Sequence, residues 1–213
     1  MKRTLPKLLA LAIIGSTSIP AISVAADKTY DQMPAGIYNI DKTHASVVWK
    51  VNHLGLSTYV ARFTSVDAVL DFNPKSPEKS SVTVRIDPKS LRTDYPYPDK
   101  EDFDGKLSTG EDWFNSEKFP EISFKSVSIE RTGDYTGVMK GDLTFLGVTK
   151  SVDLNVSFNG SFLKKPFSGM PALGFSATGV IKRSEFGMAT YVPNIGDEVE
   201  IEIEAEFTQS KPE

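Results

Sequence analysis

Hydrophobic and polar residues alternate along most of this chain, and the alternation is clearest near the C-terminus. There, five apolar residues take one phase and five glutamates take the other: Val199, Ile201, Ile203, Ala205 and Phe207 against Glu198, Glu200, Glu202, Glu204 and Glu206. Successive side chains of a β-strand point to opposite faces, whereas a helix would distribute these glutamates around its axis. The pattern therefore predicts a strand with one buried and one solvated face, which is typical of antiparallel sheets.

Similar apolar phases recur upstream. They are Ala45, Val47, Trp49 and Val51; Val66, Ala68, Leu70 and Phe72; Val82, Val84 and Ile86; Ile122 and Phe124; Met139, Leu143 and Phe145; Val148, Val152, Leu154, Val156 and Phe158; and Phe175, Ala177, Gly179 and Ile181. Turn-forming residues separate them at Asn73-Pro74, Thr132-Gly133-Asp134, Leu146-Gly147, Asn159-Gly160 and Gly196-Asp197. About eight or nine short strands at this spacing predict an all-β sandwich or barrel.

Residues 88–120 interrupt the alternation with prolines and charges. Within them, residues 99–107 are expected to form a short helix and residues 111–115 a further turn. A compact β domain rarely carries so long an irregular connection without a use for it. Two uses are compatible with the sequence: the insertion caps one end of a barrel, or it gates a ligand.

The first 26 residues have the layout of a secretory signal peptide. Positive charges at Lys2, Arg3 and Lys7 flank a short apolar run, and small residues at 23–26 (SVAA) offer a cleavage site after Ala25 or Ala26. The run is about half as long as the ~20 residues that span a bilayer. We therefore expect export to the periplasm, with residues 27–213 as one mature β-barrel domain.

Charge and composition exclude several classes of function. Losing three positive charges with the signal moves the formal net charge from −4 to −7, which does not suit nucleic acid or an anionic membrane surface. The chain has no cysteine, so it has no disulfide, thiolate metal site or cysteine nucleophile. No later apolar stretch is long enough for a membrane span. We expect a mature protein without stable membrane insertion.

Among the candidate catalytic and metal-binding residues, one histidine is expected to face the interior. The two histidines, His44 and His53, are an odd number of residues apart and should face opposite sides of one strand, which makes a poor metal pair. There is no G-x-S-x-G elbow and no phosphate-binding glycine loop. His53 continues the phase of Trp49 and Val51, so it is either a core histidine bonded to its neighbours or a polar contact for a ligand headgroup.

The interior of the predicted barrel is strongly apolar. The chain has 13 phenylalanines and two tryptophans. A barrel of about eight strands is just wide enough to be filled by its own side chains or to hold one small ligand. Small inward residues at Ala68, Gly141, Ala177 and Gly179 favour a cavity, while the count of large residues is compatible with a filled core.

Several segments, in order, resemble the YceI-like family. They are residues 38–44 (YNIDKTH), 49–55 (WKVNHLG), 62–63 (RF), 70–72 (LDF), 86–93 (IDPKSLRT), Leu107, 112–114 (DWF), 119–124 (FPEISF), 141–150 (GDLTFLGVTK) and 183–188 (RSEFGM). The match covers about residues 36–207. Two departures are Ala45, where the family often has serine, and Arg62, where a glycine is frequent.

The resemblance implies an eight-stranded, lipocalin-like antiparallel barrel with a hydrophobic tunnel. Family members bind polyisoprenoids such as isoprenoid quinones or polyprenyl phosphates, or other amphiphilic lipids; many are periplasmic, and dimers occur. We therefore expect a non-catalytic lipid carrier without cofactor, metal or nucleic-acid partner. The residues expected to contact the ligand are Trp49, His53, Phe72, Ile86, Phe124, Leu143, Phe145, Phe158, Phe175, Ile181 and Arg183.

The partner of Arg183 can be one of two kinds, and two functions other than lipid carriage are also compatible with the sequence. Arg183 continues the inward phase of Ile181, and a buried arginine needs a partner, either a carboxylate such as Asp41 or the polar head of a ligand. One alternative function is a lipid-modifying enzyme with His53 as general base. Another is a stress-related interaction protein with a solid-cored barrel, motivated by the exposed-looking Tyr95, Tyr97 and Trp113.

Overall fold

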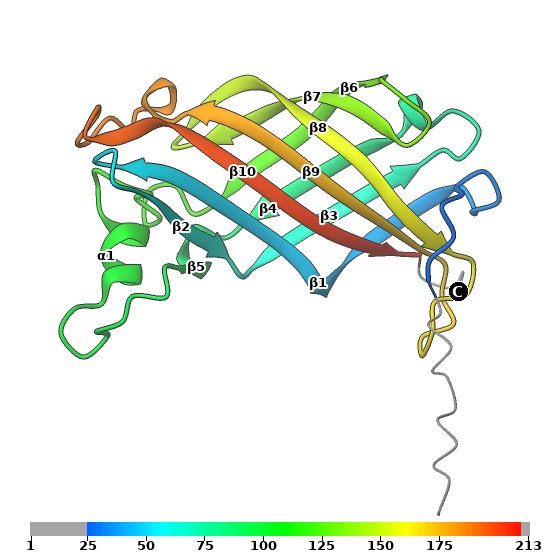
Figure 1. The fold of residues 1–213 in the computed structure, drawn as a ribbon, viewed down its shortest axis with the longest axis horizontal. Helices are drawn as coiled ribbons and strands as arrows, with labels where there is room; N and C mark the ends of the chain where they lie inside the picture. The colour runs from blue at the N-terminus through cyan, green and yellow to red at the C-terminus, as the bar shows by residue number, and fades with distance from the viewer. Residues whose placement is uncertain (1–24, 210–213) are drawn as a thin grey trace, which may run out of the picture.

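Eight antiparallel strands close into a barrel in the computed structural model, which describes residues 25–209 (Figure 1). The described residues form ten strands in all, of which β2 and β5 lie outside the closed ring: β1 (Gly36–His53), β2 (Ser57–Phe63), β3 (Val66–Phe72), β4 (Ser81–Ile86), β5 (Leu91–Arg92), β6 (Ile122–Arg131), β7 (Thr136–Phe145), β8 (Val148–Phe162), β9 (Ala172–Lys182) and β10 (Ile195–Thr208). The order around the barrel is β10-β9-β8-β7-β6-β4-β3-β1, and pairing of β10 with β1 closes it. The predicted eight-stranded antiparallel barrel is confirmed.

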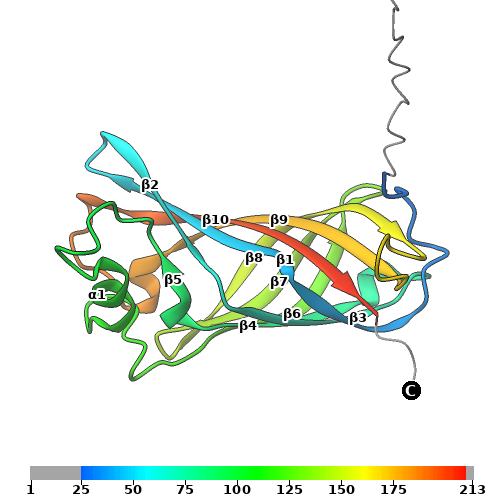
Figure 2. The same cartoon turned by 90° about the horizontal axis from the view of Figure 1, so that it is seen from below.

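The long strand β1 pairs with two different strands along the same edge. Its first residues, 36–39, pair with β3, and residues 47–53 pair with β2. The two-residue strand β5 then adds to β2. As a result, β2 and β5 extend the wall at one end of the barrel, beside the helix α1 (Phe103–Thr109) (Figure 2).

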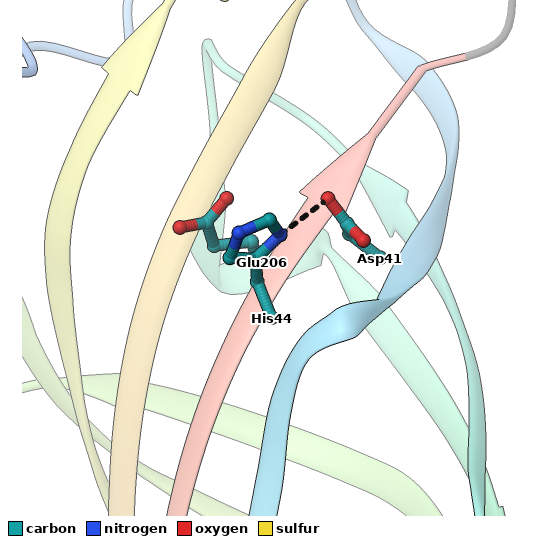
Figure 3. A group of neighbouring side chains, drawn as sticks. All are labelled: Asp41, His44 and Glu206. Atoms are coloured by element: carbon teal, nitrogen blue, oxygen red, sulfur yellow. Dashed lines mark hydrogen bonds and ion pairs between the residues drawn. The ribbon is translucent and has the colours of Figure 1, made fainter.

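A bulge divides β1 where it faces β10. The register shifts between the pairs Ile40–Phe207 and Ala45–Ala205, so residues 41–44 bulge out of the ladder. A bulge of this kind bends the strand and increases its twist, which helps a sheet close on itself. It also carries Asp41 and His44, which lie on the outside of the barrel near Glu206 (Figure 3).

The predicted alternation is visible in burial. In β3, Val66, Ala68, Leu70 and Phe72 are buried and the residues between them are exposed. In β10, the apolar residues Val199, Ile201 and Ile203 are only half-buried although they point inward, because they face a hollow interior. The barrel is therefore closed but not filled.

Two predicted turns are wrong. Asn159 and Gly160 lie inside β8, at a register shift against β9 between Phe158 and Gly160. The bulge there lets the backbone of Asp27 pair with that of Ser161, at N–O distances of 3.0 and 2.8 Å. Gly196 and Asp197 belong to β10, and the turn lies before Ile195 instead.

The insertion at 88–120 lies at one end of the barrel, where Phe103, Leu107 and Phe114 line the cavity (Figure 2). This placement agrees with the capping use, and gating of a ligand stays a prediction. The helix of the insertion begins later than expected. Asp102 is the N-cap, with Oδ1 accepting a hydrogen bond from the amide of Gly105 at 2.9 Å, so α1 spans Phe103–Thr109. The predicted turn within 111–115 is present. Of the three aromatic residues expected to be exposed, only Tyr97 is; Tyr95 and Trp113 are half-buried.

Three short 3₁₀ helices complete the described chain: η1 (Pro77–Lys79), η2 (Pro88–Ser90) and η3 (Arg183–Phe186). Among residues 25–209, no helix is long and apolar enough to cross a membrane. The predicted signal peptide lies almost entirely outside the described residues, which begin at Ala25.

Candidate functional site: the barrel cavity

The barrel encloses a cavity of about 730 Å³. This volume lies in the range of about 300–1,000 Å³ that is typical of small-molecule sites. All eleven residues expected to contact a ligand line it: Trp49, His53, Phe72, Ile86, Phe124, Leu143, Phe145, Phe158, Phe175, Ile181 and Arg183. The sequence thus located the wall of the cavity, while contact with a ligand stays a prediction.

Aromatic clusters narrow the cavity towards both ends of the barrel. At the end where the N-terminal segment lies, Phe158 contacts Tyr30, Tyr135 and Phe175, with ring centroids 5.6, 6.1 and 5.5 Å apart. At the α1 end, Phe114 lies 5.4 to 6.1 Å from the rings of three barrel residues, Trp49, Phe63 and Phe145. Phe114 therefore attaches the insertion to the inner wall.

The small inward residues make room in two different ways. Ala68 and Ala177 line the cavity directly. Gly141 and Gly179 instead accommodate neighbours, because a Cβ at Gly141 would lie 2.2 Å from the Phe124 ring and one at Gly179 would lie 2.6 Å from Leu154. The expectation that all four positions contribute open space is thus correct only for the alanines.

The two histidines lie on opposite sides of the barrel wall, as predicted. His53 lines the cavity at the end of β1, where it pairs with Ile195 of β10 and Ser57 of β2. His44 is exposed on the outer face. His53 therefore adds a polar group to an otherwise apolar wall near the α1 end.

Arg183 does not pair with Asp41, and the expectation of that ion pair is wrong. Its guanidinium is buried and donates to four backbone carbonyl oxygens, those of Gly196 (2.8 Å), Met188 (3.1 Å), Thr190 (2.9 Å) and Ile195 (2.9 Å). Burial lowers the pKa of Arg183, and the nearby charge of Asp197 acts against this effect. The five fork-shaped donors of arginine suit such a set of carbonyls. Arg183 thus fixes the loop between η3 and β10 at the cavity wall.

Asp41 pairs instead on the outer face, in a cluster that the sequence did not reveal (Figure 3). Nζ of Lys165 lies 2.9 Å from Oδ2 of Asp41 and 2.5 Å from Oε2 of Glu206, and Nδ1 of His44 lies 3.0 Å from Oδ2 of Asp41. These residues come from β1, β10 and the loop after β8. Only the short spacing of Asp41 and His44 was visible in the sequence, because the other contacts are long-range.

The same cluster has the composition of a metal site but is already neutralised. One ligand atom from each of Asp41, His44 and Glu206 lies within 4.8 Å of the others. The ammonium of Lys165 occupies the position between the two carboxylates, where a cation would have to compete with it. The arrangement supports a clamp between β1, β10 and the 163–171 loop.

Two buried polar atoms of the described residues have no hydrogen-bond partner: Nε1 of Trp49 and Oγ of Ser116. Ser116 belongs to the insertion, and Trp49 packs against Phe114 of the same segment. An unpaired buried polar group costs roughly 1–3 kcal/mol. The contact of Trp49 with Phe114 thus buries the indole N–H without a protein acceptor.

Comparison with known proteins identifies relatives along most of the chain. Residues 38–207 match the YceI-like domain family. A UPF0312 protein of Pseudomonas fluorescens is 32% identical over 209 residues, which cover 97% of this chain and all of that protein. A UPF0312 protein of Pseudomonas putida is 36% identical over 159 residues, covering 74% of this chain and 79% of that protein.

Solved structures share the barrel. A Campylobacter jejuni YCEI protein superposes with a TM-score of 0.64 at 30% identity, covering 75% of this chain and 90% of that one. BcnA of Burkholderia cenocepacia gives 0.68 at 21% identity, with 78% and 98% covered. A polyisoprenoid-binding domain from Saccharophagus degradans gives 0.57 at 9% identity, with 83% and 100% covered, and shows likeness of fold alone.

Proposed function

Because this chain belongs to the YceI-like family, we propose that it is a periplasmic carrier that holds a long-chain isoprenoid, or a similar amphiphilic lipid, in its barrel. The ligand class includes isoprenoid quinones and polyprenyl phosphates. The observation that carries the proposal is the cavity of about 730 Å³, whose wall is made almost entirely of apolar side chains. A solid-cored scaffold protein would not contain such a space.

The chemistry of the wall supports binding rather than catalysis. Burying an apolar chain contributes about 25 cal/mol per Å², before the cost of ordering the ligand. Arg183, one of the charged residues in the wall, already donates to four carbonyls, and His53 has no titratable neighbour on the inner face of β1. A lipid-modifying enzyme would need further groups positioned around His53.

The proposed location rests on the sequence. The charged and apolar start, followed by small residues at 23–26, favours export. N-terminal sequencing of the protein from a periplasmic extract checks this proposal, and we expect a first residue of Ala26 or Asp27. Recovery of the uncleaved chain from the cytoplasm would contradict it.

Native mass spectrometry after gentle purification tests lipid binding. We expect an additional mass that matches an isoprenoid or another amphiphile. Ala177→Phe, which places a ring in the cavity, should abolish it. Thr178→Phe is the matched control, because its side chain is exposed on the outer face, and it should retain the lipid. A folded wild-type protein that takes up no lipid from detergent solution would refute the proposal.

A further inference from the structure

The two ends of the cavity have rims of different chemistry. At the end where the N-terminal segment lies, the exposed residues that line the cavity are polar: Ser81, Arg131, Asp134 and Thr136. At the α1 end, they include the apolar Leu54 and Tyr191 beside Lys106 and Asn194. Among the described residues that line the cavity, large apolar side chains are thus exposed at the α1 end and not at the other.

Two chain segments make the apolar mouth. Leu54 lies in the turn between β1 and β2, and Tyr191 lies in the loop between η3 and β10; these tips lie together at the left of Figures 1 and 2. The amide of Leu54 donates to the carbonyl of Asn194 at 2.8 Å, which joins the two tips. We call Leu54, Leu56, Tyr191 and Val192 the apolar rim; they are 54, 84, 65 and 36% exposed.

The rim residues are costly for folding. Leu54 and Tyr191 have φ angles of 58° and 61°, in the left-handed region that favours glycine and asparagine. Tight hairpin turns usually carry asparagine, aspartate or glycine, whereas this turn places a leucine on each side of Gly55. Phe167 combines a similar exposure and φ angle away from the cavity, so the feature that distinguishes Leu54 and Tyr191 is that they also line the cavity.

We propose that the apolar rim inserts into the surface of a phospholipid bilayer, so that a lipid passes between bilayer and cavity without crossing water. This inference rests on the proposed lipid-carrier function. The rim is continuous with the cavity, because Leu54 and Tyr191 belong both to the exposed rim and to the cavity wall. A surface bound by the rim should therefore supply the same apolar ligand that the cavity holds, which a bilayer does. Tyrosine suits the boundary between headgroups and acyl chains, where one end of its side chain is apolar and the other wet.

The charges around the rim indicate that its contact with a bilayer is apolar rather than electrostatic. Nζ of Lys106, the basic residue of this mouth, lies 2.6 Å from Oε1 of Glu101 and is neutralised by it. The whole chain is acidic, with a formal net charge of −4. We therefore expect little attraction to anionic lipids, and insertion about as strong on neutral vesicles as on anionic ones.

Flotation with phosphatidylcholine vesicles, with and without phosphatidylglycerol, tests the inference. We expect wild-type protein to float with both. Leu56→Asp should reduce the vesicle partition coefficient at least about tenfold, because a buried leucine contributes more than one decade of affinity. Leu56 does not line the cavity, so uptake of an isoprenoid quinone from detergent should be unchanged while transfer from vesicles slows.

Phe167→Asp is the matched control. Phe167 is fully exposed and has a φ of 69°, but it lies in the loop between β8 and β9 and does not line the cavity. This variant should float like the wild type, and Leu56→Ser should repeat the effect of Leu56→Asp without a new charge. The inference is overturned if wild-type protein that takes up quinone from detergent does not float, floats only with anionic vesicles, or loses flotation on changing Phe167 and not Leu56. Failure of uptake from detergent would instead refute the carrier function itself.

Discussion

Nζ of Lys165 lies 2.9 Å from Oδ2 of Asp41, and this ion pair joins the loop after β8 to the bulge in β1. The hydrogen bond from the Thr43 hydroxyl holds the pKa of the Asp41 carboxyl well below its usual range, and contacts with Lys165 and His44 add to this, against the partial burial that acts to raise it. Burial lowers the pKa of Lys165, but its bonds to Glu206 and Asp41 outweigh that effect and raise it. The cluster is thus most stable with both groups charged.

The first prediction is that Asp41 makes the barrel sensitive to acid. Since its folded pKa is depressed below the usual 3.8, its contribution to the free energy of unfolding is complete above that value and is lost as pH falls through the folded pKa. We expect Asp41→Asn to cost about 1 kcal/mol at neutral pH and progressively less below about pH 4. Urea unfolding across this pH range measures the difference.

Asp67→Asn is the control for this prediction. Asp67 also forms an ion pair, with Lys42 at 3.3 Å, but both partners are largely exposed. Its substitution should change the free energy of unfolding by only a few tenths of a kcal/mol. Equal losses for both variants at every pH would contradict a special role for the Asp41 cluster.

The second prediction separates a structural role of Arg183 from ligand binding. Arg183→Met leaves four carbonyls without their charged donor, and we expect the free energy of unfolding to fall by about 3 kcal/mol. Arg183→Lys should recover part of this loss, because an ammonium satisfies fewer of the four acceptors. Lipid occupancy measured by native mass spectrometry should persist in both variants. Unchanged stability with lost lipid would instead assign Arg183 to a ligand headgroup.

The barrel strands could be predicted from the sequence because an apolar period of two residues fixes which face of each strand is buried. Once Val66, Ala68 and Leu70 face one side, a register slip would expose all of them, so the strand's inward face is fixed. The exceptions are local: Asn159-Gly160 is a common turn pair, but a bulge in β8 absorbs it. Tertiary pairing with β9 and with Asp27 overrides the turn preference there.

The apolar residues that line the cavity could be predicted from the sequence, but the partners of its polar residues could not. Strand phase alone identified Phe72, Phe124 and Phe158 as inward-facing. The partners of Arg183 and Asp41 depend on how loops far apart in the sequence come together, and no short-range pattern contains that information. The spacing of Arg183 after Ile181 correctly predicted a buried, inward-facing arginine, although β9 ends at Lys182 and η3 begins at Arg183.

The third prediction concerns the close contact between Gly141 and Phe124. A Cβ at position 141 would lie 2.2 Å from the Phe124 ring and 2.7 Å from the backbone oxygen of Lys125, so we expect Gly141→Ala to displace that ring and to disturb the pairing of β6 with β7. We expect a loss of about 1–3 kcal/mol in the free energy of unfolding and a lower lipid occupancy. Phe124→Leu in the same chain should restore part of both, because the smaller side chain vacates the space while the backbone oxygen of Lys125, 2.7 Å from the new Cβ, still crowds it. If the double variant is no better than Gly141→Ala, the contact is not the cause.

The fourth prediction is that Phe114 controls how fast a lipid leaves. Its ring lies 6.1, 5.4 and 5.6 Å from those of Trp49, Phe63 and Phe145, and these contacts attach the insertion to the inner wall together with the buried Leu107. Nε1 of Trp49, which belongs to the same contact, is buried without a protein acceptor. Phe114→Ala should therefore release the insertion locally without unfolding the barrel.

Two measurements check this. Hydrogen exchange should accelerate at the amides of Phe114 and Ser116, which now donate to carbonyls of Leu107 and Ser108 at 3.1 and 2.9 Å, and should be unchanged in β8 and β9. Transfer of a bound quinone to acceptor vesicles should accelerate by about tenfold or more, since a lost aromatic contact of roughly 1.5–3 kcal/mol no longer holds the insertion closed. Tyr97→Ala is the control, because Tyr97 is exposed on the same insertion and should leave the transfer rate unchanged. If Phe114→Ala accelerates exchange in the insertion but not transfer, the lipid leaves by the other mouth, past Arg131 and Asp134, and the apolar rim is not its route.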